Sequence, residues 1–571
     1  MSRIREILIE NFRGIASLSW QPQPGINGLI GPGDSSKSTI LDAIDWCIGA
    51  RRSLSVTDAD FHGLQIDRPI RILVTIGALQ ESLKSLESYG LFLRGFDAAT
   101  CAVEDEPGDG LEDVLSVELT ISDDLEPHWT LVSDRASAQG LSRNLAWADR
   151  QRLAPLRIGS FAARHMSWQR GSLLHTLSEE ELNVAAALAT ASRSARDSFG
   201  DQASASLEET LETVRAAAER LGIGGGRNPR AMLDPQTVSL SGGAITLHDD
   251  AGIPLNKLGL GSSRLLVAGL QGSAESASGI VLVDELEHGL EPHRIARFLV
   301  ALGAKETDVQ RQVFLTTHSP VVLRELQARQ LHVVRRGSSH QVLWAGSQTG
   351  LQGPLRSSAE GFLGTRVLIC EGATEVGLVR GVDLYRDDER LPTANAAGLV
   401  MVDAGGVSRV YALAKAFQAL GYEIAVLRDD DEHPKAEDEE EFLRAGGTLF
   451  KWSEDFALEE ELFFCLSDDV CVELCRLAIS IHGRKKIEDQ IKSASGQNIP
   501  LDRWLESFGD IDDCHVHTSQ AAKSGDWFKR IDLMENAARS LIAPNLDDAH
   551  EDLSSVIDGI FRWAGVDVQR S

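Results

Sequence analysis

Two kinds of apolar pattern alternate along the chain and divide it into regions. Near the N-terminus apolar and polar positions alternate from Ile4 to Ile9, and similar runs recur at residues 70–76 and 114–119. Such runs predict half-buried β-strands. From about residue 178 to 221 the apolar positions follow a helical period, in a segment rich in Ala, Leu, Glu and Arg. This segment predicts a helical insert in a β-rich region, of a kind that often serves dimerisation.

Short apolar runs separated by helical patterns fill the second half. The runs at residues 367–370, 399–402 and 423–427 have the length of buried strands, and helical patterns begin at Thr374 and cover 410–420. This alternation predicts a parallel sheet covered by helices. A Gly/Ser-rich, weakly patterned stretch places a boundary near residues 345–362. We therefore expect four parts: 1–160, 161–235, 236–350 and 351–571.

Composition narrows the class of protein. The 571 residues carry a formal net charge of -29, which argues against a uniformly basic nucleic-acid binder but allows a local basic groove. No apolar run reaches the roughly 18 residues of a membrane helix, and the seven cysteines form no CxxC pair. We therefore expect a cytoplasmic protein with reduced thiols. The acidic run at residues 437–441 predicts a solvated helix face.

Carboxylates follow two of the predicted strands. Glu371 and Glu375 lie in EGATE, directly after 367–370, and RDDD places Asp429 and Asp431 after 423–427. Hard cations such as Mg²⁺ and Mn²⁺ need several carboxylate oxygens, and two acids two positions apart can point to one side. A single acid of this kind is more often a solvated carboxylate. The combined spacing predicts a metal-dependent phosphoryl-transfer site.

A second phosphate motif, GPGDSSKST, lies far upstream between a predicted strand and a helix. Backbone N–H groups at the helix start would cradle phosphates, Lys37 would reach the β and γ oxygens, and Ser38 would ligate Mg²⁺. Ser36 stands where the motif wants glycine, so we expect ATP binding with slow hydrolysis. The predicted nucleotide contacts are Gly31, Gly33, Ser36, Lys37, Ser38 and Thr39.

Further pieces accompany this loop in a fixed order. Asp284 and Glu285 follow an apolar strand, His318 follows another, and Gly261-Ser262 lies upstream of both. Together with Asn11-Phe12-Arg13-Gly14 near the start, this set resembles the heads of ABC-type DNA ATPases, the group of SMC, RecF and RecN proteins. The resemblance implies that Asp284 holds Mg²⁺, Glu285 activates water and His318 senses the γ-phosphate. It also implies that Gly261 and Ser262 reach the nucleotide of a second subunit.

The acids of the second half, with the turn at residues 403–406, resemble a Toprim domain. An ATPase head followed by Toprim is similar to the OLD family of ATP-associated endonucleases, which includes the nuclease subunit of Gabija anti-phage systems. The implied fold class is α/β: an ABC/SMC-type P-loop head with a helical dimerisation insert, then a Toprim domain with a helical C-terminal part. The resemblance also supplies a downstream acid, Glu459 with Asp455 as substitute, and a lysine, Lys523 with Lys529 as runner-up.

Three functions are consistent with these patterns. The first is an ATP-regulated DNA endonuclease or nickase, serving anti-phage defence or DNA processing. In it Glu371, Asp429 and Asp431 hold one Mg²⁺ or Mn²⁺, Glu375 and Glu459 serve another, and Lys523 neutralises phosphate charge. The second is an SMC/RecF-like DNA-binding ATPase without nuclease activity. The third is a nucleotide sensor in which ATP restrains cutting. Expected partners are DNA, a second copy or a higher homo-oligomer, and, by family analogy, a helicase-like protein; no membrane is expected.

Overall fold

The alternating run near the N-terminus forms β1 (Arg3–Phe12), an edge-adjacent strand of a seven-stranded sheet. The sheet runs in the order β2-β1-β4-β7-β5-β6, with β8 also paired to β7, and all of these pairs are antiparallel. The strands predicted at residues 4–9, 70–76 and 114–119 are thereby confirmed. The other strands are β2 (Ile15–Trp20), β4 (Ile70–Gly77), β5 (Leu93–Asp97), β6 (Ala102–Glu104), β7 (Glu112–Ile121) and β8 (Pro127–Val132).

The computed structural model divides the chain into two compact units. Unit 1 comprises Met1–Gly28 and Ser38–Thr317, and unit 2 comprises Leu29–Lys37 and His318–Ser571. The beginning of the predicted helical insert lies outside the described residues. These are 2–159, 165–166, 172–174, 184–221, 228–230, 247–272, 279–306, 310–337, 339–348 and 350–568.

Unit 1 also contains three parallel strands, in the order β9 (Leu156–Ile158), β10 (Ile280–Val283) and β11 (Gln312–Thr316). The central strand β10 is entirely apolar and fully buried, which is typical of a strand covered on both faces. The fully buried strand β3 (Ile26–Ile30) leads into the glycine-bearing loop. Helices in this half are α1 (Lys37–Ile48), α2 (Glu81–Lys84), α3 (Leu86–Tyr89), α4 (Asp134–Ala138), α5 (Trp147–Leu153), α7 (Val184–Ser206), α8 (Glu208–Leu221), α9 (Leu260–Gly272) and α10 (Pro292–Ala301).

Unit 2 is built around a four-stranded parallel sheet in the order β15-β14-β16-β17. Its strands are the predicted apolar runs, β14 (Arg366–Cys370), β15 (Leu399–Asp403) and β16 (Glu423–Arg428), followed by β17 (Thr448–Lys451). Cys370 pairs with both Asp403 and Leu427, so three strands end at the same edge of the sheet. Acids that follow these strands are therefore brought together.

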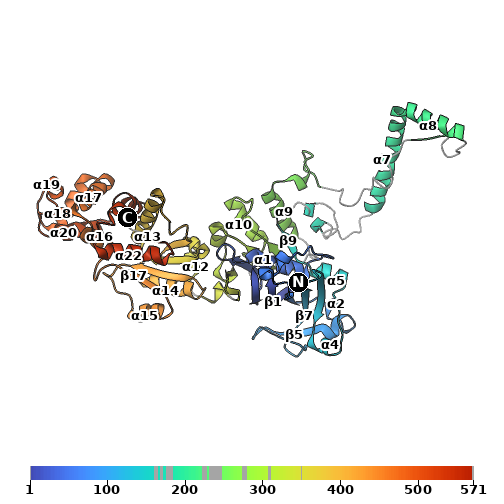
Figure 1. Cartoon of the computed structure of the whole chain (residues 1–571), viewed down its shortest axis with the longest axis horizontal. Helices are drawn as coiled ribbons and strands as arrows, with labels where there is room; N and C mark the ends of the chain where they lie inside the picture. Colours follow the sequence, from blue (N-terminus) through green and yellow to red (C-terminus); the bar gives the residue numbers. More distant parts are fainter. Residues whose placement is uncertain are drawn as a thin grey trace. The chain divides into compact units, whose positions relative to one another are not determined.

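Helices cover both faces of this sheet. Figure 1 shows α13 (Ala373–Asp388) and α22 (Glu551–Trp563) on one side, and α14 (Val407–Gln418) and α15 (Ala436–Arg444) on the other. This arrangement confirms the predicted helix-covered parallel sheet. The remaining elements of unit 2 are β12 (Leu331–Arg335), β13 (Gln341–Trp344), α11 (Pro320–Glu325), α12 (Gln352–Ser357), α16 (Leu458–Cys465), α17 (Asp468–His482), α18 (Arg484–Ser495), α19 (Leu501–Glu506), α20 (Cys514–Ser524) and α21 (Ile531–Ala537).

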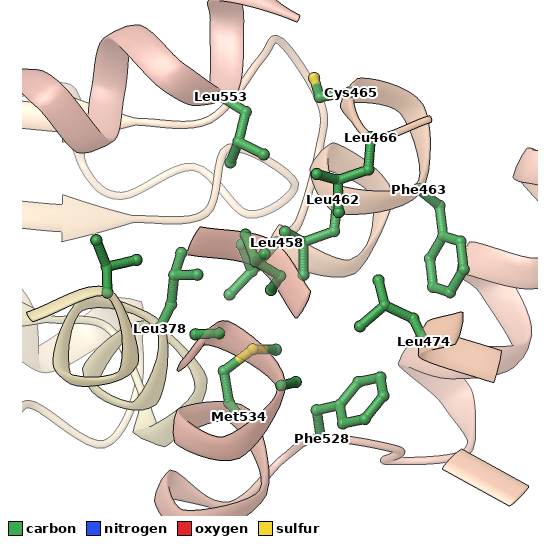
Figure 2. Close-up of a cluster of buried hydrophobic side chains, with 14 of the residues drawn as sticks. Leu378, Leu458, Leu462, Phe463, Cys465, Leu466, Leu474, Phe528, Met534 and Leu553 are labelled. Carbon is green, nitrogen blue, oxygen red and sulfur yellow. The ribbon is translucent and has the colours of Figure 1, made fainter. Parts of the chain in front are cut away.

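One hydrophobic cluster joins the helices next to the strand-end acids. Figure 2 shows Leu378 of α13, Leu458 and Leu462 of α16, and Met534 of α21 meeting in it, all nearly inaccessible to solvent. Since burial of each such side chain contributes about 1.5–3 kcal/mol, this cluster holds α13 and α16 firmly in place.

The stretch expected to separate domains near residues 345–362 is folded into unit 2. It forms α12 and a 3₁₀ turn at Ala359–Leu363, and it buries Leu355 and Phe362 completely. Within the described part of the chain, no helix combines the length and the apolar character needed to cross a bilayer.

Candidate active site

Glu371 and Glu375 are placed by the junction between β14 and α13. Strand β14 ends at Cys370, so Glu371 is the first residue beyond the sheet edge. Glu375 lies in the first turn of α13, where its Oε2 accepts the Gly372 N–H at 2.8 Å. This is the N-terminal capping interaction expected of a glutamate at that position. The cap buries Glu375 to 2% exposure.

Asp429 and Asp431 follow β16 at the same edge. The Asp429 N–H donates to Oε2 of Glu371 at 3.2 Å, which ties the two acid-bearing loops together. Asp429 Oδ1 accepts the Leu458 N–H at 3.0 Å, at the start of α16. Asp431 instead pairs with the ammonium of Lys523 at 2.9 Å. Three separate segments are thus joined at this loop.

Helix α16 begins with three consecutive glutamates that have different partners. Glu460 Oε2 accepts the Ala457 N–H at 2.7 Å, and fully buried Glu461 accepts the Ser453 N–H at 3.0 Å. Glu459 is 7% exposed and faces the charges of Glu375 and Asp429. Asp455, the substitute ligand considered from the sequence, lies exposed in the preceding turn.

The four acids Glu371, Glu375, Asp429 and Glu459 share one electrostatic environment. Burial raises the pKa of each of them. The pKa of Asp429 is raised further by the charges of Glu375, Glu371 and Glu459, and that of Glu375 by Glu459 and Glu371. Like charges held close together in a buried site destabilise the ionised forms, and a bound cation relieves that cost.

Lys523 is the lysine held at these acids. It lies on α20, and its ammonium contacts Asp431 at 2.9 Å and Glu460 at 3.0 Å. Burial alone would lower the pKa of Lys523, but these two hydrogen bonds raise it to about 12. Lys529 is exposed and pairs with Asp526 at 3.4 Å. Lys523 is therefore a cation anchored in the site, whereas Lys529 affects it through space by lowering the pKa of Glu459.

The donor set has the chemistry of a hard-cation site. All candidate ligands are carboxylates, which suit Mg²⁺ or Mn²⁺, and no thiol or imidazole is among them. As the side chains stand, no three His, Cys, Asp or Glu residues within the described ranges form a group ready to hold a metal ion. Glu375 and Asp429 are engaged with backbone N–H groups instead, so metal binding would require small rotations of these carboxylates.

Sequence reasoning missed the residues that support these acids. Arg428 and Lys451 hold the middle acid, Asp430, at 2.9 and 3.2 Å, and Glu460 holds Lys523. Arg428 directly precedes the three aspartates, and this adjacency was the available signal. Lys451 and Glu460 carried no comparable signal, because their partners are distant in sequence.

The phosphate-binding loop GPGDSSKST has a strained backbone at Ser36, the position where the motif has glycine. Ser36 has φ +69°, a left-handed conformation that glycine adopts readily and other residues adopt at a cost. Its hydroxyl lies 3.2 Å from Nε2 of His340. Buried Lys37 donates to the carbonyls of Gly31 and Pro32 at 3.1 and 2.8 Å. The loop thus keeps the shape that the motif requires although Ser36 replaces the glycine.

Ser38, the next residue, lies at the start of α1 and meets the acid pair of unit 1. Its hydroxyl donates to Asp284 Oδ1 at 2.8 Å, and Thr316 Oγ1 donates to the same oxygen at 2.6 Å. Glu285 is exposed with φ +44°. The guanidinium of Arg264, 1% exposed, donates to the carbonyls of Asp284, Glu285 and His288. Arg264 therefore braces the whole acid turn, a role that the sequence did not reveal.

The other predicted nucleotide contacts lie near helix starts and differ in their exposure to solvent. Gly261 lies in the first turn of α9, where a Cβ would come within 2.1 Å of the Gly289 carbonyl, so only glycine fits. The Ser262 hydroxyl accepts from Arg294 at 3.1 Å. His318 is exposed beyond β11, Gly33 faces open space, and Thr39 is half-buried in α1.

A lysine and a serine that end a glycine-bearing loop after a buried strand, together with an acid pair after a second strand, define an ATPase-type nucleotide-binding domain. The chain belongs to the family described as "AAA domain, putative AbiEii toxin, Type IV TA system", whose model matches residues 26–324, more than half of the chain.

The chain is also similar to individual proteins. The chain is 22% identical over 475 residues to the OLD nuclease of Thermus scotoductus, covering 77% of this chain and 84% of that protein. It is 38% identical over 58 residues to the DNA replication and repair protein RecF of Chlorobium luteolum, a match that spans 10% of this chain and 16% of RecF.

Solved structures of SMC heads also align with the chain. The SMC head bound to the C-terminal winged-helix domain of ScpA gives a TM-score of 0.30 with 11% identity, covering 60% of this chain and 97% of that one. The SMC head domain from Thermotoga maritima gives 0.27 with 13% identity, covering 60% and 98%. These TM-scores lie below the level at which two folds are equated.

Proposed function

We propose that this chain is an ATP-binding, divalent-metal-dependent DNA nuclease of the OLD type. The observation that carries the proposal is the gathering of four carboxylates at the edge of a parallel sheet, with Glu375 and Glu459 buried and Glu371 and Asp429 half-buried, beside one anchored lysine, Lys523. The relation to an OLD nuclease over most of both chains supports it.

The roles of the residues follow from their positions. Glu371, Asp429 and Asp431 would hold one Mg²⁺ or Mn²⁺, and Glu375 and Glu459 a second. Bound divalent cations would activate water and stabilise the leaving oxygen of a phosphodiester. Lys523 keeps a positive charge beside Asp431, where it can bind a non-bridging phosphate oxygen and favour the more negative transition state.

Cleavage of supercoiled plasmid with Mg²⁺ or Mn²⁺ tests the nuclease. The variant Glu371→Gln keeps an acceptor for the Asp429 N–H but removes the charge, and we expect its rate to fall by about 10² or more. Glu440→Gln is the matched control. Because Glu440 is 71% exposed on α15, this variant should cleave DNA at the wild-type rate. Equal activity of wild type and Glu371→Gln with both metals and with supercoiled, nicked and linear DNA would sink the proposal.

A DNA-binding ATPase without nuclease activity is the second candidate. It is motivated by the formal net charge of -29 and by the three adjacent glutamates of α16, Glu459, Glu460 and Glu461, among which the third acid of the site has to be chosen. Metal-dependent cutting that is present in wild type and lost in Asp429→Asn would exclude it. A gel-shift assay in which wild type and Asp429→Asn both bind DNA and neither cuts it would support a DNA-binding ATPase.

We propose further that ATP occupancy controls cutting, with slow hydrolysis because of Ser36. Cutting measured against ATP concentration gives the sign: restraint predicts a fall, and stimulation contradicts restraint. Lys37→Ala should lose the dependence in either case, because Lys37 is the phosphate-reaching lysine of the loop. ATP-independent cutting in wild type would refute control by nucleotide.

Assembly through the helical insert is also proposed. Phe199, Leu207 and Val214 of the α7–α8 region are apolar side chains that are 44–45% exposed, and we propose that a second copy of the chain covers them. Light scattering should give the molar mass of a dimer or a higher oligomer, and the double variant Phe199→Ser, Val214→Ser should have a lower molar mass. A wild-type monomer at micromolar concentration would contradict this proposal. Binding of a helicase-like protein and a role in anti-phage defence remain predictions from the family resemblance.

A further inference from the structure

A buried arginine lies directly before the strand-end aspartates. Arg428 is the last residue of β16, and its side chain is 4% exposed. Its Nη1 donates to the Asp429 carbonyl at 2.6 Å and to Asp430 Oδ1 at 2.9 Å. Its Nε and Nη2 both donate to Glu439 Oε2, at 3.2 and 3.0 Å. The Arg428 guanidinium thus joins the aspartate loop to helix α15, which carries Glu439.

The middle aspartate of the loop is held from every side. Besides Arg428, Lys451 donates to Asp430 Oδ1 at 3.2 Å, and the Asp430 N–H donates to the Phe456 carbonyl at 2.9 Å. With Asp430 fixed toward Arg428 and Lys451, the flanking Asp429 and Asp431 are left to face Leu458 and Lys523. The direction of both outer acids therefore depends on how the middle one is held.

The acidic helix α15 takes part in this arrangement. The sequence predicted a solvated face at residues 437–441, and for Glu439 that prediction is wrong. Glu439 also accepts a hydrogen bond from the Tyr411 hydroxyl, and Arg428 Nε lies 3.3 Å from the same hydroxyl. Asp438 and Glu441 both pair with Lys415 of α14, at 2.8 and 2.7 Å. The helix is thereby fixed to α14, so Glu439 is a rigid support for Arg428.

We propose that Arg428, supported by Glu439 and Tyr411, is a positioning residue that aims Asp429 and Asp431 at the divalent cation of the proposed nuclease. The inference rests on the proposed function. Arginine is required because its planar fork offers donors to a backbone carbonyl and two carboxylates at once, a geometry that the single ammonium of lysine does not reproduce.

Mn²⁺ binding by the intact protein without ATP, measured by calorimetry and by the EPR signal of free Mn²⁺, tests this role. We expect the dissociation constant to rise about 10- to 100-fold in Arg428→Lys, the range typical of losing a partner that orients a metal ligand, and less in Glu439→Gln and Tyr411→Phe. Arg444→Lys is the matched control, since Arg444 is 74% exposed on α15 and should bind Mn²⁺ as wild type does.

Cleavage provides a second readout. The Mn²⁺ concentration that gives half-maximal cutting should rise by the same factor, while the rate at saturating Mn²⁺ largely recovers. A general structural defect would lower that rate at every concentration instead. If folded Arg428→Lys and Glu439→Gln bind Mn²⁺ with wild-type affinity, the role of Arg428 is refuted while the proposed function stands. If Arg428→Lys does not fold, the Mn²⁺ affinities of Glu439→Gln and Tyr411→Phe provide the test. Failure of the wild-type protein to bind Mn²⁺ would overturn the proposed function and this inference with it.

Discussion

The close contact between α13 and α21 gives a prediction whose size can be worked out from the structure. A Cβ added at Gly381 of α13 would lie 2.5 Å from the Cβ of Ala538 and 2.5 Å from the Glu535 carbonyl oxygen. Ordinary carbon contacts are about 3.5–4.0 Å, so the helices would have to separate by roughly 1 Å. Neither neighbouring atom belongs to a flexible side-chain end that could rotate away.

The change Gly381→Ala therefore combines two opposing effects. Overpacking of this kind costs about 1–3 kcal/mol, whereas removing a glycine from a helix interior contributes up to about 1 kcal/mol of stability. The net expectation is a loss of about 1–2 kcal/mol. Because α13 carries Glu375 in its first turn, the same displacement also moves a candidate ligand.

Thermal unfolding followed by circular dichroism and calorimetry measures the effect. For a unit of this size, about 1 kcal/mol corresponds to a Tm change of about 2–4 °C, so Gly381→Ala should lower the unit 2 transition by several degrees. Gly269→Ala is the matched control: Gly269 lies inside α9 with no atom within 4 Å of its added Cβ, and the change should be neutral or stabilising. A rise in Tm in both variants would refute the packing argument.

Three further predictions concern other buried groups. Burial lowers the pKa of His332 to about 3 from its ordinary 6.5, so between these two values the unfolded chain binds a proton that the folded chain does not. His332 should therefore reduce stability by about 1.4 kcal/mol for each pH unit from pH 6.5 down to about pH 3. Denaturation curves of His332→Gln should lack this contribution, and an unchanged slope would contradict the assignment. Arg264→Met leaves three carbonyls without their donor and should destabilise unit 1 by about 3 kcal/mol, measured by urea unfolding; a loss under 1 kcal/mol would count against the brace. Burial and the neighbouring acids raise the pKa of the Asp429 carboxyl group, which means that its ionised form is destabilised. Asp429→Asn removes the ionisable group but keeps an oxygen that can accept the Leu458 N–H, so the metal-free variant should have a higher Tm. A lower Tm would argue against charge repulsion.

Strands and their ends could be predicted because their signals are local. The apolar runs at residues 280–283, 367–370 and 423–427 are short, continuous and bounded by polar residues, and they form β10, β14 and β16 with boundaries within one residue. The parallel order of unit 2 follows from the helices between them. Burial inside the Gly/Ser-rich stretch could not be predicted, because the fully buried Leu355 and Phe362 are covered by residues from other parts of the chain.

The candidate site could be predicted only in part, because the contacts that distinguish its residues come from distant parts of the chain. Glu459, Glu460 and Glu461 are chemically alike and adjacent, and their different partners become visible only when Lys523 and Ser453 are placed in space. The acidic run at 437–441 was expected to be solvated because the cations that hold Asp438, Glu439 and Glu441 lie on other elements. Arg428 and Lys415 supply those cations from other elements.

The pairing of Lys523 with Asp431 and Glu460 has a consequence for protein synthesis. The acids precede α20 in the chain, so until α20 is made Asp431 and Glu460 lack the lysine that pairs with both of them. Mutual repulsion then opposes their gathering at the sheet edge. Under the proposed function, a nascent chain carries an incomplete centre, so the cell's own DNA would meet a competent enzyme only after translation has passed Lys523.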